Sequence, residues 1–422
     1  MNCLGFLVLV AFIIVALAVA WSRLLAALYP EKVRTNEVAY ITTSDGWKLR
    51  LCRYRKEHSS GEPVLLVHGL NANQNNFTSP ADACLVDYLS GQGYDCWTID
   101  LRGTRSSQPA EGQGRSTVEV EDFVWRDLPA AIEHIQKTTG YAKLHYVGHS
   151  LGGLLLYAYA QALGTDKIAS GTALGAPTQF TAAKLFLPGC LKFMALHCPW
   201  LAGEMLRCAL PFARLAGIGT SALPVNIANL PASMDLASIY PILDDPAPRV
   251  HAQIFGWGDS GEITLRGDSL NLSKGFDGMK FPLLAIFAPQ DPFVPLVSAR
   301  AFFAGVAHSD KQMIICSREN GCAEDYGHCD LAFAREGEKE VFEPILQWMK
   351  AHPAAASKKT AVAEAPAAAA PAPAAAAVPE AAKEAVAVKS AAAPKKAAPA
   401  KAAVAKAEAA PAKAAAPKKA AA

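Results

Sequence analysis

The segment Leu144-His145-Tyr146-Val147-Gly148-His149-Ser150-Leu151-Gly152-Gly153 decides the fold of this chain. A short apolar run stops at Gly148, and a helix-like apolar pattern resumes over Leu151–Leu163. A strand, a sharp turn and a helix in this order form the Gly-x-Ser-x-Gly elbow, in which the serine has a strained backbone and its flanking glycines lack side chains. The turn exposes the hydroxyl, and the start of the helix directs backbone N–H groups toward the atom that it attacks. We therefore predict that Ser150 is a nucleophile.

Strand and helix patterns alternate around the elbow, which predicts an α/β fold with a mostly parallel central sheet flanked by helices. Short continuous apolar runs are typical of strands buried on both faces. A hairpin over Val38–Thr43 and Trp47–Tyr54 precedes them, joined by a turn at Ser44-Asp45-Gly46. The expected buried strands are Pro63–Val67, Tyr94–Ile99, Leu144–Val147, Ala169–Leu174 and Phe281–Ala288.

The loop after the first buried strand reads His68-Gly69-Leu70-Asn71. In hydrolases with a serine elbow, this loop supplies the second N–H of the oxyanion hole, and the residue after the nucleophile supplies the first. We expect the backbone N–H groups of Leu70 and Leu151 in these roles. His68 precedes the nucleophile in the chain, so we interpret it as a structural residue that orients the loop. Asp100 and Arg102, which follow the next strand, are interpreted as ions that brace their loop.

These patterns resemble the α/β-hydrolase superfamily, and in particular its lipase and esterase members with a long cap. The resemblance runs from about Glu37 to Lys350. Its motifs are His68-Gly69-Leu70, Asp100-Leu101-Arg102-Gly103 and Gly148-His149-Ser150-Leu151-Gly152, with two later ones around Asp291 and His328. Arg105 departs from the pattern, since relatives often carry glycine there. The resemblance implies a catalytic triad in the chain order Ser, Asp, His, and it implies neither a metal nor an organic cofactor.

That chain order selects the acid and the base. Asp291 follows the apolar run Phe281–Ala288, and His328 follows a final short strand at Gln312–Cys316. His308 precedes that last strand, and His352 borders the C-terminal tail, so neither is in position. We expect His328 to accept the serine proton and Asp291 to fix the imidazole tautomer and stabilise the imidazolium.

The connection between Ala176 and Phe281 is too long for a simple loop, which predicts a helical cap inserted at about residues 178–275. Its first half is rich in large apolar side chains, and prolines divide it into short helices. One interpretation is that these side chains pack the cap onto the core. The other is that they line an acyl-chain pocket or rest on a bilayer. The apolar residues are Leu185, Phe186, Leu187, Phe193, Met194, Trp200, Leu201, Met205, Leu206, Leu210 and Phe212.

Residues 1–30 hold an uncharged apolar run, Leu4–Trp21, whose 18 residues are just long enough to cross a bilayer as a helix. We expect an N-terminal single-pass transmembrane anchor that places the protein at a membrane. The cations that follow this run favour a cytoplasmic C-terminal side. The alternative is a secretory signal peptide, since Ala18-Val19-Ala20 resembles a cleavage site.

The ends of the chain differ in charge from the middle. Residues 353–422 are rich in alanine, proline and lysine, and from Ala354 onward eleven lysines against four glutamates give +7. The remainder has 29 basic and 34 acidic residues, or −5. We expect a disordered tail that acts as a solvated spacer, with weak contact to an anionic lipid, nucleic acid or cell-wall polymer as the alternative. The domain between the two ends is residues 31–352.

Ten cysteines without a C-x-x-C pair argue against a zinc site, so no metal is expected. Cys322 and Cys329 flank the loop of His328, and disulfides are expected if the domain lies outside the cytosol.

The sequence as a whole predicts a membrane-anchored serine hydrolase of esters with apolar acyl groups, a lipase or esterase that acts through an acyl-enzyme. An acyltransferase or thioesterase would use the same triad. A non-catalytic binding protein that presents the basic tail is the alternative from another class, but it has no need of Ser150, Asp291 and His328 together.

Overall fold

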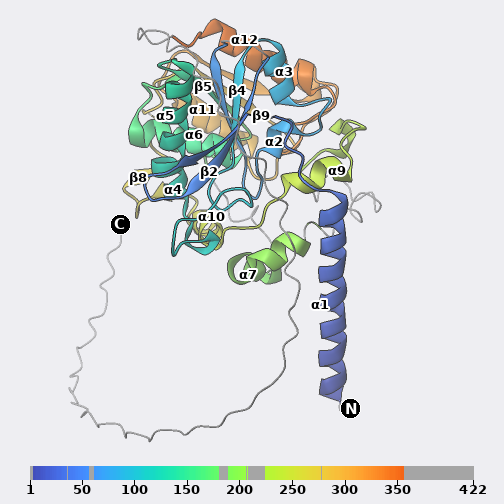
Figure 1. Cartoon of the computed structure of the whole chain (residues 1–422). Coiled ribbons are helices and arrows are strands. Elements are labelled where there is room, and N and C mark those ends of the chain that lie inside the picture. Colours follow the sequence, from blue (N-terminus) through green and yellow to red (C-terminus); the bar gives the residue numbers. More distant parts are fainter. Residues whose placement is uncertain are drawn as a thin grey trace, which may run out of the picture. The chain divides into compact units, whose positions relative to one another are not determined.

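The structure is a computed structural model, and it describes residues 3–35, 37–56, 61–179, 189–205, 207, 224–276 and 278–355. Within this part of the chain the strands form an eight-stranded sheet in the order β1-β2-β4-β3-β5-β6-β9-β10, which confirms the predicted fold class (Figure 1). The first two neighbouring pairs in this order, β1–β2 and β2–β4, are antiparallel, and the other five pairs are parallel. The strands are β1 (Glu37–Thr42), β2 (Lys48–Tyr54), β3 (Pro63–Val67), β4 (Asp95–Ile99), β5 (Leu144–His149), β6 (Ile168–Leu174), β9 (Leu283–Phe287) and β10 (Lys311–Ile315).

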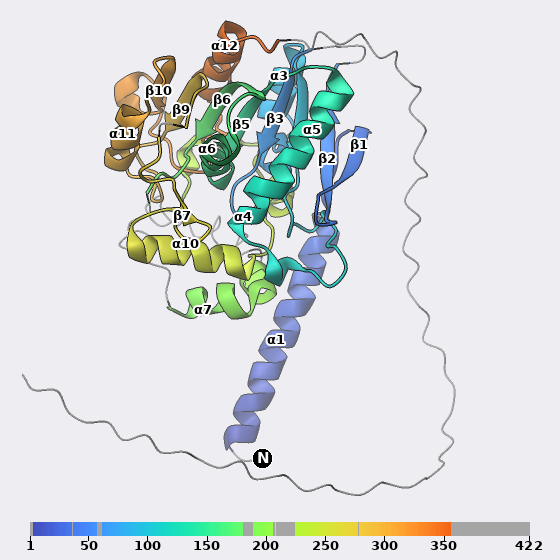
Figure 2. The same ribbon diagram turned by 90° about the vertical axis from the view of Figure 1, so that its left-hand side faces the viewer.

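Helices cover both faces of the sheet (Figure 2). Successive side chains of a strand point to opposite faces, so neighbouring residues enter different cores. Leu65 of β3 packs with α5 and α6, whereas Leu66 packs with α3 and α12. Burial on both faces is the reason why β3 and β9 are apolar throughout. The helices are α1 (Cys3–Leu28), α2 (Asn75–Thr78), α3 (Leu85–Gly91), α4 (Val120–Asp122), α5 (Leu128–Thr139), α6 (Leu151–Leu163), α7 (Gly189–His197), α9 (Leu236–Ile239), α10 (Pro248–Ser260), α11 (Leu296–Gly305) and α12 (Glu343–Ala351).

The N-terminal apolar run forms part of the long helix α1. No helix among the described residues is both long enough and apolar enough to cross a membrane. The expectation of a transmembrane helix over Leu4–Trp21 is therefore not supported. The helix continues past this run into the protein, because Leu25 is buried and the Ser22 hydroxyl donates a hydrogen bond to Glu204 of the insertion between β6 and β9.

The described part of that insertion is not purely helical. It contains α7, α9 and α10, but it ends in a short antiparallel hairpin of β7 (Thr264–Leu265) and β8 (Leu270–Asn271). Arg105 fixes its middle, since the guanidinium donates to the carbonyl oxygen of Leu243 at 2.9 Å and the backbone N–H donates to Asp244 at 3.1 Å. Arg105, the residue that departs from the family pattern in the loop after β4, therefore anchors the middle of this insertion to that loop. Of the apolar residues expected here, Leu185, Phe186, Leu187, Leu206, Leu210 and Phe212 lie outside the described residues.

The domain extends slightly beyond the expected boundary at His352. Ala354 is buried and its N–H donates to Glu62, while the carbonyl oxygen of Ala355 accepts the N–H of Ala142 at 3.4 Å. The rest of the expected tail, residues 356–422, lies outside the described residues.

Candidate active site

The elbow has the geometry that its glycines predict. Ser150 follows β5 directly and has φ 54° and ψ −117°, a conformation that costs energy for a residue with a side chain. A Cβ atom on Gly148 would lie 2.4 Å from the backbone of Gly152, and one on Gly152 would lie 2.0 Å from the carbonyl oxygen of Val67. Only glycine therefore lets α6 start this close to β3 and β5.

The predicted acid and base lie together at the ends of β9 and β10. The Nδ1–H of His328 donates to Oδ2 of Asp291 at 2.6 Å, and both residues are buried. The other oxygen, Oδ1, accepts the backbone N–H groups of Phe293 and Val294 at 2.7 and 3.0 Å. The carboxylate is thus held at both oxygens, and the imidazole is left with Nε2 as the nitrogen that can accept a proton.

The elbow meets the histidine through the residue before the serine. The rings of His149 and His328 lie with their centroids 5.0 Å apart. Phe293 contacts the His328 ring edge-on, also at 5.0 Å between centroids. The Ser150 hydroxyl has no hydrogen-bond partner among the described residues.

The two expected oxyanion donors line one cavity. Leu70 and Leu151 both border a narrow cavity of about 40 Å³, together with His68, Gly69 and Asp244. The loop that carries Leu70 passes close to Ser150, since a Cβ on Gly69 would lie 3.1 Å from the Cβ of Ser150. This places both backbones on the same side of the elbow. A larger hollow of about 500 Å³ lies between β10 and α12, and none of the predicted site residues lines it.

His68, Asp100 and Arg102 have the structural roles expected of them. The buried His68 donates from Nδ1 to the carbonyl oxygen of Gly69 at 2.8 Å and accepts the N–H of Leu101 at Nε2, at 3.2 Å. Burial lowers the pKa of His68 to about 4, so the ring is neutral at pH 7. Asp100 accepts the N–H of Gln74 and forms an ion pair with Arg50.

The Arg102 guanidinium is buried between Asp127 and Asp45, with contacts of 2.7 Å to each. Burial raises the pKa of Asp127 to about 6 despite this partner.

His149 is a site residue that the sequence did not reveal. Its Nε2 contacts the carbonyl oxygen of His328 at 3.1 Å, and its Nδ1 contacts Asn76 at 3.1 Å. Burial, with the neighbouring His328, lowers the pKa of His149 to about 3, so only one ring nitrogen carries hydrogen. That hydrogen belongs on Nε2, because a carbonyl oxygen can only accept. Turning the Asn76 amide then pairs its Nδ2, which lacks a partner in the described part of the chain, with Nδ1 of His149.

Asp330 is a second residue that the sequence did not reveal. Its fully buried carboxylate accepts the N–H groups of Gly327 and Asn226 at 3.0 and 3.1 Å and the side-chain amide of Asn229 at 2.7 Å. The N–H of Cys329 also donates to the carbonyl oxygen of Pro224 at 2.8 Å. The histidine loop and residues 224–229 of the insertion therefore form one hydrogen-bonded unit. The only sequence signal for this role of Asp330 was its position two residues after His328.

Within the described residues, no group of three or more His, Cys, Asp or Glu side chains is arranged to hold a metal ion.

Comparison with known proteins identifies the family. Residues 62–326 match the model of the alpha/beta hydrolase fold family. This segment is more than half of the 422 residues, so the chain belongs to that family.

The curated relatives that it resembles are lipases. It is 37% identical over 123 residues to Lipase 1 of Drosophila melanogaster, a match that covers 28% of each chain. It is 36% identical over 129 residues to the human lysosomal acid lipase/cholesteryl ester hydrolase, covering 28% of this chain and 32% of the relative. These matches span less than a third of the relatives' length. Lipase lipl-1 of Caenorhabditis elegans is 22% identical over 363 residues, covering 72% of this chain and 86% of the relative.

Solved structures share the fold but differ in activity. A putative aryl esterase from Burkholderia cenocepacia is similar with a TM-score of 0.51 and 20% identity, covering 75% of this chain and 99% of its own. The epoxide hydrolase CorEH is similar with the same TM-score and 18% identity, over the same shares of the two chains. The fold alone therefore does not select the reaction.

Proposed function

We propose that this protein is a carboxylic-ester hydrolase of the lipase or esterase type, with Ser150 as nucleophile, His328 as general base and acid, and Asp291 as the residue that orients the histidine. The observation that carries the proposal is the His328–Asp291 hydrogen bond of 2.6 Å beside a serine at φ 54°. The similarity to named lipases supports the same chemistry.

The reaction follows from the positions of these groups. The Ser150 oxygen attacks the ester carbonyl carbon while Nε2 of His328 takes its proton. Asp291 keeps the proton on Nδ1 and stabilises the imidazolium. The N–H groups of Leu70 and Leu151 hold the developing oxyanion, each worth about 3 kcal/mol in the transition state. His328 then protonates the leaving alcohol, and water cleaves the acyl-enzyme by the reverse sequence.

An apolar acyl group is the proposed substrate element. The insertion between β6 and β9 acts as a cap in this proposal, since Asp244 and Val250 of the insertion border the same cavity as Leu70 and Leu151. Large apolar side chains of the cap are exposed, Phe193 by 58% and Trp200 by 53%. Such side chains suit an apolar chain or a lipid surface better than water.

We also propose that the protein works at a membrane and that α1 contacts the lipid there. The described side chains of α1 expose large apolar groups on many sides, which a helix in water normally avoids. The exposed residues are Phe6, Leu9, Phe12, Ile13, Val15, Leu17, Val19, Trp21, Leu24 and Leu28.

The catalytic proposal is tested on the full chain with a fluorophosphonate probe and p-nitrophenyl esters of graded chain length. We expect wild type to be labelled and to hydrolyse these esters, and Ser150→Ala to lose labelling and at least about 10³-fold in kcat. A folded wild-type protein that neither labels nor turns over any ester would refute the proposal. Adding an alcohol or a thioester to the same assay separates hydrolysis from acyl transfer and thioester cleavage.

A further inference from the structure

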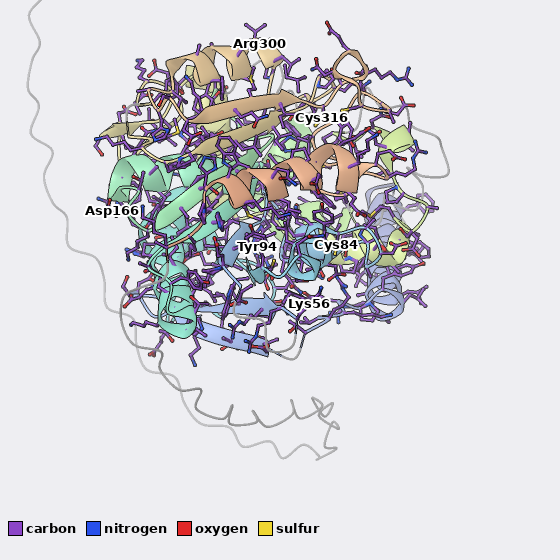
Figure 3. All side chains as sticks on the ribbon, turned by 90° about the horizontal axis from the view of Figure 1, so that it is seen from above. Lys56, Cys84, Tyr94, Asp166, Arg300 and Cys316 are labelled. Atoms are coloured by element: carbon purple, nitrogen blue, oxygen red, sulfur yellow. The ribbon has the colours of Figure 1, made fainter. Side chains whose placement is uncertain are left out.

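Two cysteines in the loop that carries His328 have no part in the proposed catalysis. Cys316, labelled in Figure 3, follows β10 immediately. It is fully buried, whereas Cys322 is partly exposed. Both are free thiols in the structure. Cys316 and Cys322, a buried and an accessible thiol six positions apart, are a different pair from Cys322 and Cys329, which the sequence analysis singled out.

The backbone brings the two thiols together. A turn over Arg318–Asn320 and the left-handed Gly321, with φ 93°, reverse the chain between them. The N–H of Cys322 then donates to the carbonyl oxygen of Ser317 at 3.0 Å, which returns Cys322 to the residue next to Cys316. The side chains belong to one apolar cluster, because Cys322 packs on the cluster that contains Cys316.

The two thiols differ in chemistry. The neighbouring Cys316 thiol lowers the pKa of Cys322, and the neighbouring Cys322 thiol, followed by burial, raises the pKa of Cys316. Glu340 opposes thiolate formation at both positions, and Asp330 does so at Cys316. The accessible Cys322 sulfur is therefore the better nucleophile for the first step, and the buried Cys316 sulfur is left for the second step.

We propose that Cys316 and Cys322 form a thiol–disulfide exchange site that takes small disulfides of the glutathione class and closes into a disulfide within the histidine loop. The Cys322 thiolate attacks one sulfur of the small disulfide and releases one thiolate, which leaves a mixed disulfide on Cys322. The Cys316 sulfur then attacks the Cys322 sulfur, gives up its proton and releases the second small thiol. Two protein thiols are oxidised, and one small disulfide is reduced to two thiols.

The bridge would restrain the segment that leads to the catalytic residues. The carbonyl oxygen of Cys316 accepts the N–H of Tyr326 at 3.1 Å, and the carbonyl oxygen of Tyr326 accepts the N–H of Gln290, next to Asp291, at 3.0 Å. A link between Cys316 and Cys322 therefore narrows the freedom of the chain just before His328. The effect on catalysis rests on the proposed function, whereas formation of the disulfide is independent of it.

The test treats the full chain with oxidised glutathione at pH 8 and maps cysteines by peptide mass spectrometry. We expect wild type to gain a Cys316–Cys322 disulfide, Cys316→Ser to retain glutathione on Cys322, and Cys322→Ser to leave Cys316 unmodified. The matched control Cys329→Ser, in the same loop, should form the bridge as wild type does. Circular dichroism verifies that each variant is folded.

Three outcomes of the glutathione experiment would contradict the proposal. A wild-type protein that keeps glutathione on Cys322, links Cys322 to Cys329 or shows no change at either cysteine overturns the proposal. A second readout is the unfolding temperature, which we expect to rise by about 2–5 °C on oxidation of wild type, because the bridge restricts the unfolded chain. The rise should be absent in the Cys316→Ser/Cys322→Ser double variant, and a rise in that variant would assign the effect to another cysteine.

Discussion

At the scale of single residues, the site depends on side chains whose protonation is set by burial. His68 and His149 are kept neutral inside the protein, and each is hydrogen-bonded to a backbone carbonyl oxygen of a loop that carries a predicted catalytic or oxyanion residue. Their neutral rings can accept a hydrogen bond at one nitrogen and donate at the other, which lysine or a carboxylate cannot do at pH 7. This chemistry connects the stability of the site to pH.

His68 should make the protein sensitive to acid. Its pKa of about 4 lies below the value of about 6.5 in an unfolded chain, so the unfolded state binds more protons between these values. The stabilising contribution is complete above pH 6.5 and is lost as the pH falls toward 4. Between pH 7.5 and pH 5 we expect wild type to lose about 2 kcal/mol more unfolding free energy than His68→Asn, measured by urea titration. Buried acids such as Asp127 occur in both proteins and cancel, so parallel losses would contradict this prediction.

At the scale of elements, the contacts between loops and helix starts decide the geometry. The histidine loop is joined to residues 224–229 through Asp330, and α6 approaches β3 through Gly152. Neither contact tolerates a change of side chain. The Asp330 carboxylate accepts hydrogen bonds from three buried donors, and the approach of α6 at Gly152 leaves no space for a methyl group.

Replacing Asp330 by asparagine should loosen the histidine loop. The new amide would direct N–H groups at donors that now meet a carboxylate, which costs about 1–3 kcal/mol of stability. We expect Asp330→Asn to unfold at lower urea concentration and to lose more in kcat than in KM, because His328 is two residues away. Asp325→Asn is the matched control, since that side chain accepts only the exposed N–H of Arg318 among the described residues. Equal urea midpoints and equal changes in kcat and KM for the two variants would show that Asp330 does not position the histidine loop.

Alanine at Gly152 should separate α6 from the sheet. Its Cβ would lie 2.0 Å from the carbonyl oxygen of Val67, a backbone atom that cannot turn aside. We expect a loss of about 3 kcal/mol or more in unfolding free energy, at the upper end of overpacking costs. Gly91→Ala, where the added Cβ meets nothing within 4 Å, should leave stability unchanged or slightly raised. A Gly152→Ala protein as stable as wild type would mean that the elbow can relax.

At the scale of the whole molecule, the hydrolase domain and α1 present very different surfaces. The domain buries most of its large apolar side chains in three clusters, whereas α1 leaves many of its own exposed. Apolar side chains of this size gain about 1.5–3 kcal/mol each when they leave water. The exposed surface of α1 is therefore the basis for the proposed contact with lipid.

Charges placed on α1 should abolish that contact. Phe12 is 70% exposed and Leu17 is 65% exposed. We expect the Phe12→Glu/Leu17→Glu double variant to bind phosphatidylcholine vesicles at least about 100-fold more weakly than wild type in a flotation assay. Neutral vesicles remove the electrostatic contribution of the basic tail. Val297→Glu, on α11 and 81% exposed, is the control and should bind as wild type does. Unchanged binding by the double variant would exclude α1 as the lipid contact.

The sequence alone predicted the alternation of strands and helices along the domain, the strained turn at Ser150, and that Asp291 and His328 follow the last two strands of the sheet, where the structure brings them together. These features are local, because buried strands require continuous apolar runs and a strained turn requires its glycines. The tertiary structure alone decided that Asp330 and residues 224–229 form one unit, that His149 holds the carbonyl group of His328, and that Cys316 meets Cys322. No local sequence pattern predicts such contacts, because a buried polar group pairs with whichever group the folded chain brings next to it.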